Sequence, residues 1–200
     1  ERHVRDGATL AASPAELASK VDVVFTCLPS PTVSEKVLTQ ILTTLKPGST
    51  WIENSTNGRD EMIRLASMAE AKGIKVLEAP VTGGVHLAAR GEITVLVGGD
   101  KELFEQFRPA LETIGKKIFL MGPIGSAAVI KVITNMLAFI HLVADAEALM
   151  LAKRGGLDLG QAWHAITASS GSSFVHETEG QLILNGSYDI AFTMDLALKD

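Results

Sequence analysis

Before residue 122, hydrophobic residues gather in short runs that are separated by longer stretches of helical pattern. The runs cover residues 21–28, 50–53, 74–78, 93–97 and 117–121. Nearly continuous runs of this kind, rich in β-branched residues, are typical of strands that are buried in a parallel sheet. Their alternation with helical segments predicts an α/β domain that carries helices on both faces of a parallel sheet.

Short polar residues stand where several of these helices are expected to begin. Ser13 precedes Pro14 and Glu16, a combination that favours the first turn of a helix. Asp100 and Asp158 occupy the same position ahead of later helical stretches. Their side-chain oxygens can accept hydrogen bonds from the first free N–H groups of a helix. We therefore predict all three as N-caps.

The longest hydrophobic stretch runs from Gly125 to about Arg154 and ends at Gly155 and Gly156. No proline or glycine interrupts it, so it predicts one helix of roughly 45 Å. Gly155 is predicted to close it in the left-handed conformation. Lys131 and Asn135 are four residues apart and therefore project from one face, beside small alanines. A small polar molecule fits such a surface, although a lysine whose stem covers hydrophobic surface is the plainer interpretation.

Composition narrows the class of protein. The 200 residues carry a net charge of −5 and 46% hydrophobic residues, with a mean hydropathy of +0.24. An acidic chain without a basic cluster does not fit nucleic acid. The single cysteine, Cys27, excludes an internal disulfide and a cysteine metal cluster. Residues 132–152 are apolar enough for a membrane, but Asp145 and Glu147 favour an interface helix of a soluble protein instead. We expect the protein in the reducing cytoplasm or in an organelle matrix.

The segment 79–84 carries two adjacent glycines after a predicted strand. In open α/β sheets, ligands bind at the carboxyl ends of the strands, which here are residues 28–29, 54–56 and 80–84. Gly83 and Gly84 allow a close backbone approach, and Thr82 adds a hydroxyl donor. A carboxylate fits such a set of donors, and an ordinary glycine turn is the alternative.

Five segments in unbroken order carry a resemblance to a known family. They are Leu28-Pro29, residues 52–56 (Ile-Glu-Asn-Ser-Thr), residues 78–84 (Glu-Ala-Pro-Val-Thr-Gly-Gly), residues 125–135 around Lys131, and residues 198–200. Together they resemble the β-hydroxyacid dehydrogenase family, typified by 3-hydroxyisobutyrate dehydrogenase. The resemblance implies a Rossmann-like NAD(P)-binding domain over residues 1–122. An all-helical domain for substrate binding and dimerisation would follow over residues 123–200, joined to the first by the long interdomain helix.

The resemblance also implies a chemistry. Members of the family transfer a hydride between NAD or NADP and a small β-hydroxy acid. Lys131 matches the catalytic lysine, and a desolvated lysine is a suitable acid/base because burial lowers a lysine pKa. Asn135 matches a residue that holds the substrate, and Thr82, Gly83 and Gly84 match the loop for the substrate carboxylate. Independently of the resemblance, the apolar surface of the long helix exceeds what one short helical domain could cover, so we expect a homodimer or homotetramer.

Four positions match residues that line the cofactor in the family. These are Leu28, Pro29 and Thr56 at the strand ends, and Lys199 near the nicotinamide. The sequence holds no G-x-G-x-x-G loop. We expect that loop upstream, in about one further βαβ unit of roughly 30 residues, and more helices downstream. The choice between NAD and NADP is expected there too, and residues 1–200 alone are expected to bind a dinucleotide weakly.

Several alternatives stay open at this point. Thr134 stands where hydroxyisobutyrate enzymes usually have asparagine and 6-phosphogluconate dehydrogenases have histidine. Because that histidine is missing, the sequence gives less support to a decarboxylating activity. A tartronate or succinic semialdehyde reductase would use the same residues. A catalytically silent relative would keep the fold but has no chemical need for Lys131. His141 and Asp145 are spaced like metal ligands, but without a third ligand a surface pair is favoured, and we predict no metal site.

Overall fold

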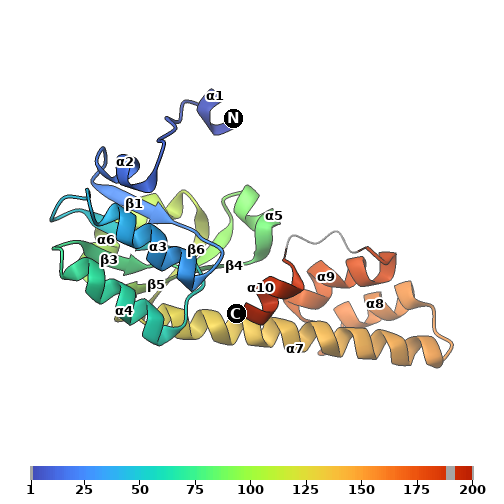
Figure 1. The fold of residues 1–200 in the computed structure, drawn as a ribbon. Coiled ribbons are helices and arrows are strands. Elements are labelled where there is room, and N and C mark those ends of the chain that lie inside the picture. The colour runs from blue at the N-terminus through green and yellow to red at the C-terminus, as the bar shows by residue number, and fades with distance from the viewer. Residues whose placement is uncertain (1, 188–191, 200) are drawn as a thin grey trace. The chain divides into compact units, whose positions relative to one another are not determined.

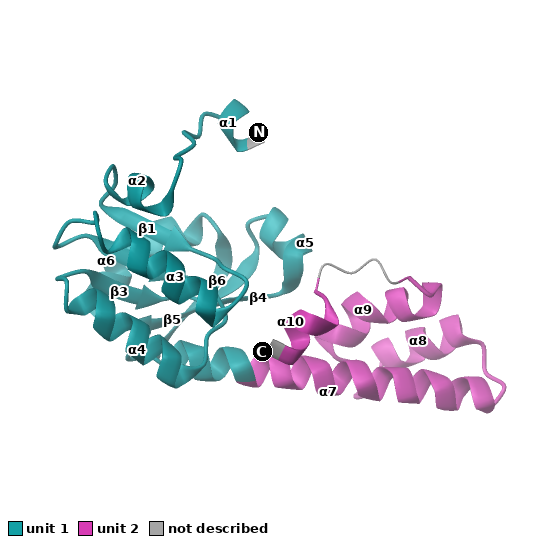
Figure 2. Ribbon diagram, in the orientation of Figure 1, with its two compact units in different colours: residues 1–132 teal, residues 133–200 magenta. Residues whose placement is uncertain are grey.

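The computed structural model describes residues 2–187 and 192–199 (Figure 1). The chain divides into two compact units, residues 1–132 and residues 133–200 (Figure 2). Helix α7 (Ser126–Arg154) begins in the first unit and ends in the second. Its bounds agree with the predicted long helix to within one residue.

The first unit is built on a sheet of six strands within the described residues. In sheet order these run β1-β2-β3-β5-β4, with β6 paired to the other side of β5. The strands are β1 (Val23–Thr26), β2 (Thr50–Glu53), β3 (Lys75–Glu78), β4 (Val81–Thr82), β5 (Ile93–Gly99) and β6 (Gly115–Gly122).

The sheet is mixed, so the prediction of a parallel sheet is only partly right. β1, β2 and β3 are parallel, but β5 is antiparallel to both β3 and β4, and β6 is parallel to β5. The reason lies in the short connection over residues 83–92. A parallel crossover needs about a dozen residues or more, so β5 returns antiparallel to β4 instead. Strand β4 was not predicted, because a strand of two residues carries no periodic pattern.

Helices cover both faces of the sheet, as predicted. The three predicted N-caps are confirmed: Ser13 Oγ, Asp100 Oδ1 and Asp158 Oδ1 accept hydrogen bonds from backbone N–H groups at 3.1, 2.8 and 2.8 Å. The helices of this unit before α7 are α1 (Arg2–Arg5), α2 (Pro14–Ala18), α3 (Pro31–Ile41), α4 (Arg59–Glu70), α5 (Gly84–Ala89) and α6 (Lys101–Glu112).

Each face of the sheet has its own hydrophobic core. On one face Trp51 and neighbouring strand residues pack with α3 and α4, and Ala128 at the start of α7 joins this cluster. On the other face Ile52 and Leu77 pack with α6, including Phe104. Fully burying one such side chain stabilises a fold by about 1.5–3 kcal/mol. The beginning of α7 is therefore part of the core of the first unit.

The second unit is helical within its described residues. After α7 it contains α8 (Leu159–Thr167), α9 (Phe174–Asn185) and α10 (Met194–Lys199). The predicted cap at Gly155 is wrong by one residue, since Gly156 has the positive φ of 77°. The N–H of Leu157 donates to the carbonyl of Ala152 at 3.0 Å, which places the left-handed residue at 156. Among the described helices, only α7 is long and apolar enough to cross a membrane.

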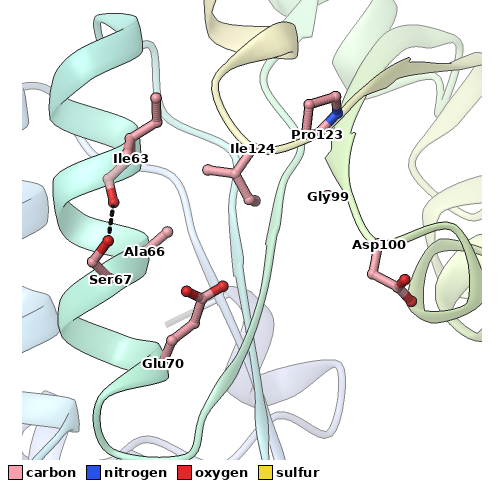
Figure 3. A pocket seen from close by; sticks show the side chains of 8 residues that line it. All are labelled: Ile63, Ala66, Ser67, Glu70, Gly99, Asp100, Pro123 and Ile124. Carbon is pink, nitrogen blue, oxygen red and sulfur yellow. Dashed lines mark hydrogen bonds between the residues drawn. The ribbon is translucent and has the colours of Figure 1, made fainter.

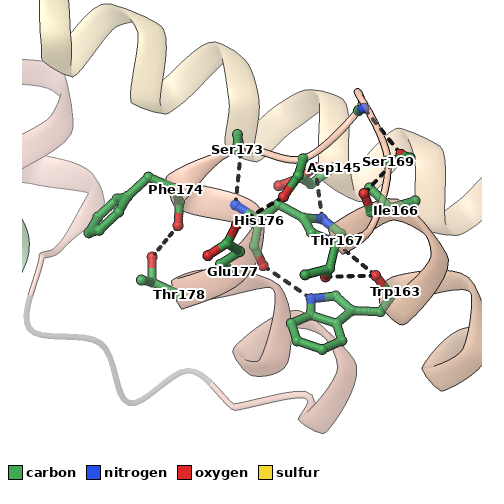
Figure 4. Close-up of polar contacts among 12 residues, drawn as sticks. Asp145, Trp163, Ile166, Thr167, Ser169, Ser173, Phe174, His176, Glu177 and Thr178 are labelled. Carbon is green, nitrogen blue, oxygen red and sulfur yellow. Dashed lines mark hydrogen bonds and ion pairs between the residues drawn. The ribbon is translucent and has the colours of Figure 1, made fainter.

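A buried polar cluster joins the helices of the second unit (Figure 4). His176 has no exposed surface, and its Nδ1 lies 3.2 Å from Asp145 Oδ1. Its Nε2 lies 3.1 Å from the carbonyl oxygen of Trp163, which can only accept, so Nε2 carries a hydrogen. The Trp163 indole N–H donates in turn to the carbonyl of His176 at 3.1 Å. Asp145 therefore faces His176 of α9 rather than forming a surface pair with His141.

Candidate active site

The carboxyl ends of the strands carry a row of polar residues. In the sheet register Thr26 lies beside Glu53, Glu53 beside Glu78, and Glu78 beside Gly98. Neighbours in register on parallel strands point to the same face, which here is the face that α3, α4 and the start of α7 cover. Both glutamates are buried, with exposures of 0% and 1%.

Glu53 is the centre of a hydrogen-bond network that ties two strand-end loops together. The Thr26 hydroxyl donates to Glu53 Oε2 at 3.0 Å and accepts from the indole N–H of Trp51 at 2.8 Å. The backbone N–H of Ser55 donates to Glu53 Oε1 at 2.7 Å. Ser55 Oγ accepts from the N–H of Leu28, also at 2.7 Å. The loops after β1 and β2 are thereby fixed to each other.

The residues predicted to line the cofactor lie in these two loops. Leu28 and Thr56 are half-buried, and Pro29 is exposed. Next to Thr56, the side chain of Asn57 is 3% exposed, yet its Oδ1 and Nδ2 have no hydrogen-bonding partner among the described residues. A buried amide without partners costs about 1–3 kcal/mol, and a polar ligand at this edge would remove that cost. The strand-end loops therefore offer a place for a polar ligand. Lys199 ends α10, and its side chain lies outside the described part of the structure.

Lys131 lies on α7 within the first unit and is 8% exposed. Its charge acts on the end of β1. Partial burial of the sulfur raises the pKa of the Cys27 thiol and the Glu53 carboxylate adds to this, whereas the Lys131 ammonium opposes both. Charges act strongly only over short distances in a protein. The first turn of α7, which precedes Lys131, is hydrogen-bonded to Glu78 at the carboxyl end of β3. This contact supports a position of Lys131 near the same edge of the sheet.

The predicted substrate residues lie in two different places. Thr82 ends β4 and is half-buried. Gly83 and Gly84 follow with φ values of 125° and 80°, a conformation that side chains with a Cβ rarely adopt. The two glycines therefore form a sharp turn, which agrees with either interpretation of this segment, so its role in binding a carboxylate stays a prediction. Asn135 is half-buried on α7, one turn beyond Lys131, and belongs to the second unit.

A shallow groove of about 420 Å³ lies on the first unit (Figure 3). Side chains of α4 form one side, and the ends of β5 and β6 form the other. None of the predicted site residues lines it. The groove is therefore not the candidate active site, which is defined by the strand ends and Lys131.

Two residues of this region were not predicted to have a role. Glu53 and Glu78 were noted only as parts of the motifs at residues 52–56 and 78–84. Each is a charged residue that directly follows a buried hydrophobic run. Acidic residues are rarely fully buried unless they are paired. The position of a glutamate after such a run was the available signal, but its partners come from other elements and cannot be seen in the sequence.

Glu53 provides a prediction on the pH dependence of stability. Burial raises the pKa of Glu53 above 4.5, although hydrogen bonds from Ser55 and Thr26 oppose the shift. The native chain then holds a proton that the unfolded chain releases. This contribution to stability is fully present below pH 4.5 and is lost as the pH rises through the native-state pKa. In Glu53→Gln, the free energy of unfolding should fall less between pH 4.5 and neutral pH than in the wild type.

Urea denaturation at a series of pH values measures this difference. Glu112→Gln is the matched control, because Glu112 is an exposed glutamate of the same unit. A Glu53→Gln profile parallel to that of the wild type would show that the buried carboxyl keeps an ordinary pKa.

Comparison with known proteins agrees with this geometry. A family model described as the NAD binding domain of 6-phosphogluconate dehydrogenase matches residues 1–122. A second, described as NAD-binding of NADP-dependent 3-hydroxyisobutyrate dehydrogenase, matches residues 125–200. The 2-(hydroxymethyl)glutarate dehydrogenase of Eubacterium barkeri is 32% identical over 98% of this chain and 67% of its own length.

Two further comparisons give the same picture. An L-threonate dehydrogenase of Escherichia coli O6:H1 is 31% identical over 93% of this chain, which spans 63% of that relative. The crystal structure of 3-hydroxyisobutyrate dehydrogenase from Salmonella typhimurium is 29% identical with a TM-score of 0.90, over 99% of this chain and 70% of its own. The resemblance that the sequence motifs indicated is confirmed. This chain belongs to the β-hydroxyacid dehydrogenase family of NAD- or NADP-dependent oxidoreductases.

Proposed function

We propose that the complete protein containing this chain transfers a hydride between NAD or NADP and a small β-hydroxy acid, with Lys131 as the acid/base. The observation that carries the proposal is a buried lysine that follows the first turn of α7, which Glu78 holds at the carboxyl end of β3. In open α/β sheets this edge is where ligands bind. A buried lysine there has a chemical use that a lysine on an exposed helix face would lack.

The chemistry assigns Lys131 a defined proton. The bound nicotinamide supplies the hydride acceptor or donor. In the oxidation direction, the hydroxyl O–H bond breaks as the carbon loses its hydride, and the neutral amine of Lys131 takes the proton. The carbonyl group forms in the same step. In the reduction direction, the Lys131 ammonium returns the proton to the carbonyl oxygen.

Other residues of the chain would bind and orient the reactants. The turn at Gly83 and Gly84, together with the Thr82 hydroxyl, would receive the substrate carboxylate. The Asn135 amide would bind the substrate next to Lys131. The cofactor would be lined by Leu28, Pro29 and Thr56. Lys199, the fourth residue predicted to bind the cofactor, would approach its nicotinamide end.

The substrate class follows from the chemistry of the relatives' names. 3-Hydroxyisobutyrate and 2-(hydroxymethyl)glutarate are both carboxylic acids with a hydroxymethyl group on the α carbon. L-Threonate carries hydroxyls on its α, β and γ carbons. All three molecules therefore contain a hydroxyl on the carbon that is β to the carboxylate, which supports the proposed substrate class. A reductase of tartronate or succinic semialdehyde remains the alternative within the family.

A substrate panel tests the proposal. The complete protein is assayed with NAD and with NADP against 3-hydroxyisobutyrate, 2-(hydroxymethyl)glutarate, L-threonate and the two semialdehydes. We expect turnover on at least one β-hydroxy acid and none on an analogue that lacks the hydroxyl. Turnover confined to the semialdehydes would select the alternative reductase. Tight cofactor binding without turnover on any of them would favour the silent relative.

We also propose that the protein is a homodimer or homotetramer of the cytoplasm. Ile133, Met136, Ile140 and Val143 lie three or four residues apart on α7 and are 40–60% exposed in this chain. A stripe of this spacing forms one helix face. The same helix buries Lys131 and Asp145, and such charges are costly in a membrane, so a protein partner suits the stripe better than lipid.

Charging this stripe is expected to dissociate the oligomer. Ile140→Lys places an ammonium in the centre of the proposed interface, where a buried, unpaired charge is unfavourable. Sedimentation velocity of the complete protein at micromolar concentration measures the outcome. Lys153→Met, which alters an exposed residue near the end of the same helix, is the control. An oligomer unchanged by Ile140→Lys would place the interface elsewhere.

A further inference from the structure

The beginning of α7 is held by a buried carboxylate from the sheet. The backbone N–H groups of Ala127 and Ala128 donate to Glu78 Oε1 and Oε2 at 2.9 and 3.1 Å. These belong to the first turn of the helix, where N–H groups have no partner within the helix. Each carboxylate oxygen thus satisfies one of them. This single side chain links strand β3 to helix α7. Ala127 and Ala128 lie 49 and 50 positions after Glu78 along the chain.

The site that holds this carboxylate is closely fitted. Glu78 is 1% exposed, and its neighbour in the antiparallel register is Gly98 of β5. A Cβ at residue 98 would overlap Glu78 Oε1 and would lie 2.9 Å from its Cδ and Cγ. Only glycine leaves room for the carboxyl arm at this position. Two strands therefore cooperate to aim one carboxylate at the helix.

The electrostatics of this contact are also unusual. Burial raises the pKa of Glu78, and the backbone N–H groups of Ala127, Gly125 and Ala128 oppose that shift. A carboxylate at a helix N-terminus interacts favourably with the helix dipole. Serine, threonine, asparagine or aspartate just before the helix is the usual cap. Here the cap is supplied by the sheet, so it sets the position of the helix relative to the strands.

The position of the first turn determines the position of Lys131. In an α-helix the N–H of residue 131 bonds to the carbonyl of residue 127, and the two residues lie on the same face. Ala127 and Ala128 are 0% and 2% exposed and leave no space for the turn to rotate freely. We propose that Glu78 is a positioning residue for catalysis: it fixes the start of α7 and thereby places the Lys131 amine at the strand ends. This inference rests on the proposed function, because it takes Lys131 as the acid/base.

Three variants of the complete protein test the inference. Glu78→Gln keeps the volume but replaces one accepting oxygen by an NH2 donor, which would face one of the two N–H groups that the carboxylate now satisfies. Gly98→Ala displaces the carboxyl from the opposite strand without changing it. Glu78→Asp keeps the carboxylate on a side chain that is one methylene shorter. It replaces Glu78→Gln in the test if Glu78→Gln does not fold. Asp100→Ala is the matched control, because it removes a carboxylate cap from α6 of the same unit.

The first readout does not depend on activity. Hydrogen exchange of the Ala127 and Ala128 amides should be about ten- to a hundredfold faster in Glu78→Gln and in Gly98→Ala, as expected for a lost bond to a charged acceptor. The NMR signal of the Lys131 side chain should shift in both variants. Asp100→Ala should change neither. Unchanged exchange and an unchanged Lys131 signal would overturn the inference, even if the wild type turned out to have no dehydrogenase activity.

The second readout is catalytic. In Glu78→Gln and Gly98→Ala, kcat should fall by about tenfold or more, because a small misplacement of a catalytic group is costly. KM should change much less. Asp100→Ala should lower thermal stability yet keep kcat within about twofold, as a lost cap remote from the reaction would. A kcat in Glu78→Gln that equals that of Asp100→Ala at matched stability would overturn the inference. Absence of turnover in the wild type would instead refute the proposed function and leave the exchange result to decide.

Discussion

Replacing Lys131 by methionine is expected to lower kcat by about 10²–10⁴-fold, the usual contribution of a positioned acid/base. Methionine keeps most of the length of the side chain and suits the buried position, in which Lys131 is 8% exposed. The fold should therefore persist, and the dissociation constant of NAD or NADP should stay within about threefold, which corresponds to less than 1 kcal/mol. Steady-state kinetics and cofactor titration measure the two quantities.

The matched control for this prediction is Lys153→Met, on the exposed surface at the end of the same helix. It removes the same charge without touching the strand ends, and kcat should not change. A Lys131→Met variant that also keeps its wild-type kcat would return Lys131 to the simpler interpretation, a lysine whose stem covers hydrophobic surface.

The second large effect is expected on stability, in the helical unit. His176→Ala removes a ring that has no exposed surface and that contacts Asp145 and the carbonyl of Trp163. It leaves a cavity and a buried carboxylate that has lost its neighbour. Leaving a buried polar group without its partner costs about 1–3 kcal/mol, and the cavity adds to this cost. For a chain of this size, such a loss lowers Tm by on the order of ten degrees.

Thermal unfolding of His176→Ala beside His141→Ala checks this expectation. His141 is an exposed histidine on α7 in the same unit, and its replacement should change the free energy of unfolding by less than about 0.5 kcal/mol. If both variants melted at the same temperature, the cluster of Asp145, Trp163 and His176 would not be a stabilising feature of the unit.

Local chemistry explains which parts of the fold were predictable. Strands β1, β2 and β3 and the N-caps Ser13 and Asp100 depend on residues that are close in sequence, so the hydrophobic pattern predicts them. The same holds for α7, which contains no helix breaker after Gly125. Strand β4 and the antiparallel direction of β5 depend on pairing between distant segments. No local pattern indicates such pairing. The prediction of a parallel sheet was therefore right for β1, β2 and β3 and wrong for the pairing of β5 with β3 and β4.

The candidate site was predictable to a similar degree. Lys131 and the glycine turn at 83–84 are recognisable because their residue types and spacing suit a ligand. Glu53 and Glu78 carry no such signal, since their functions depend on Ser55, on Thr26 and on the first turn of α7. The pairing of His176 with Asp145 carries no sequence signal either, because the two residues are 31 positions apart along the chain. A single sequence does not show which side chains contact each other between different helices and strands.

The most direct test of the proposed function is the fate of one hydrogen. The complete protein is given a β-hydroxy acid that carries deuterium on the carbon bearing the hydroxyl, and the reduced cofactor is analysed by mass spectrometry. The account predicts that the deuterium is found on the nicotinamide, with the hydroxyl proton released to Lys131 and then to water. Reduced cofactor without deuterium, or deuterium appearing in the solvent, would contradict hydride transfer from that carbon.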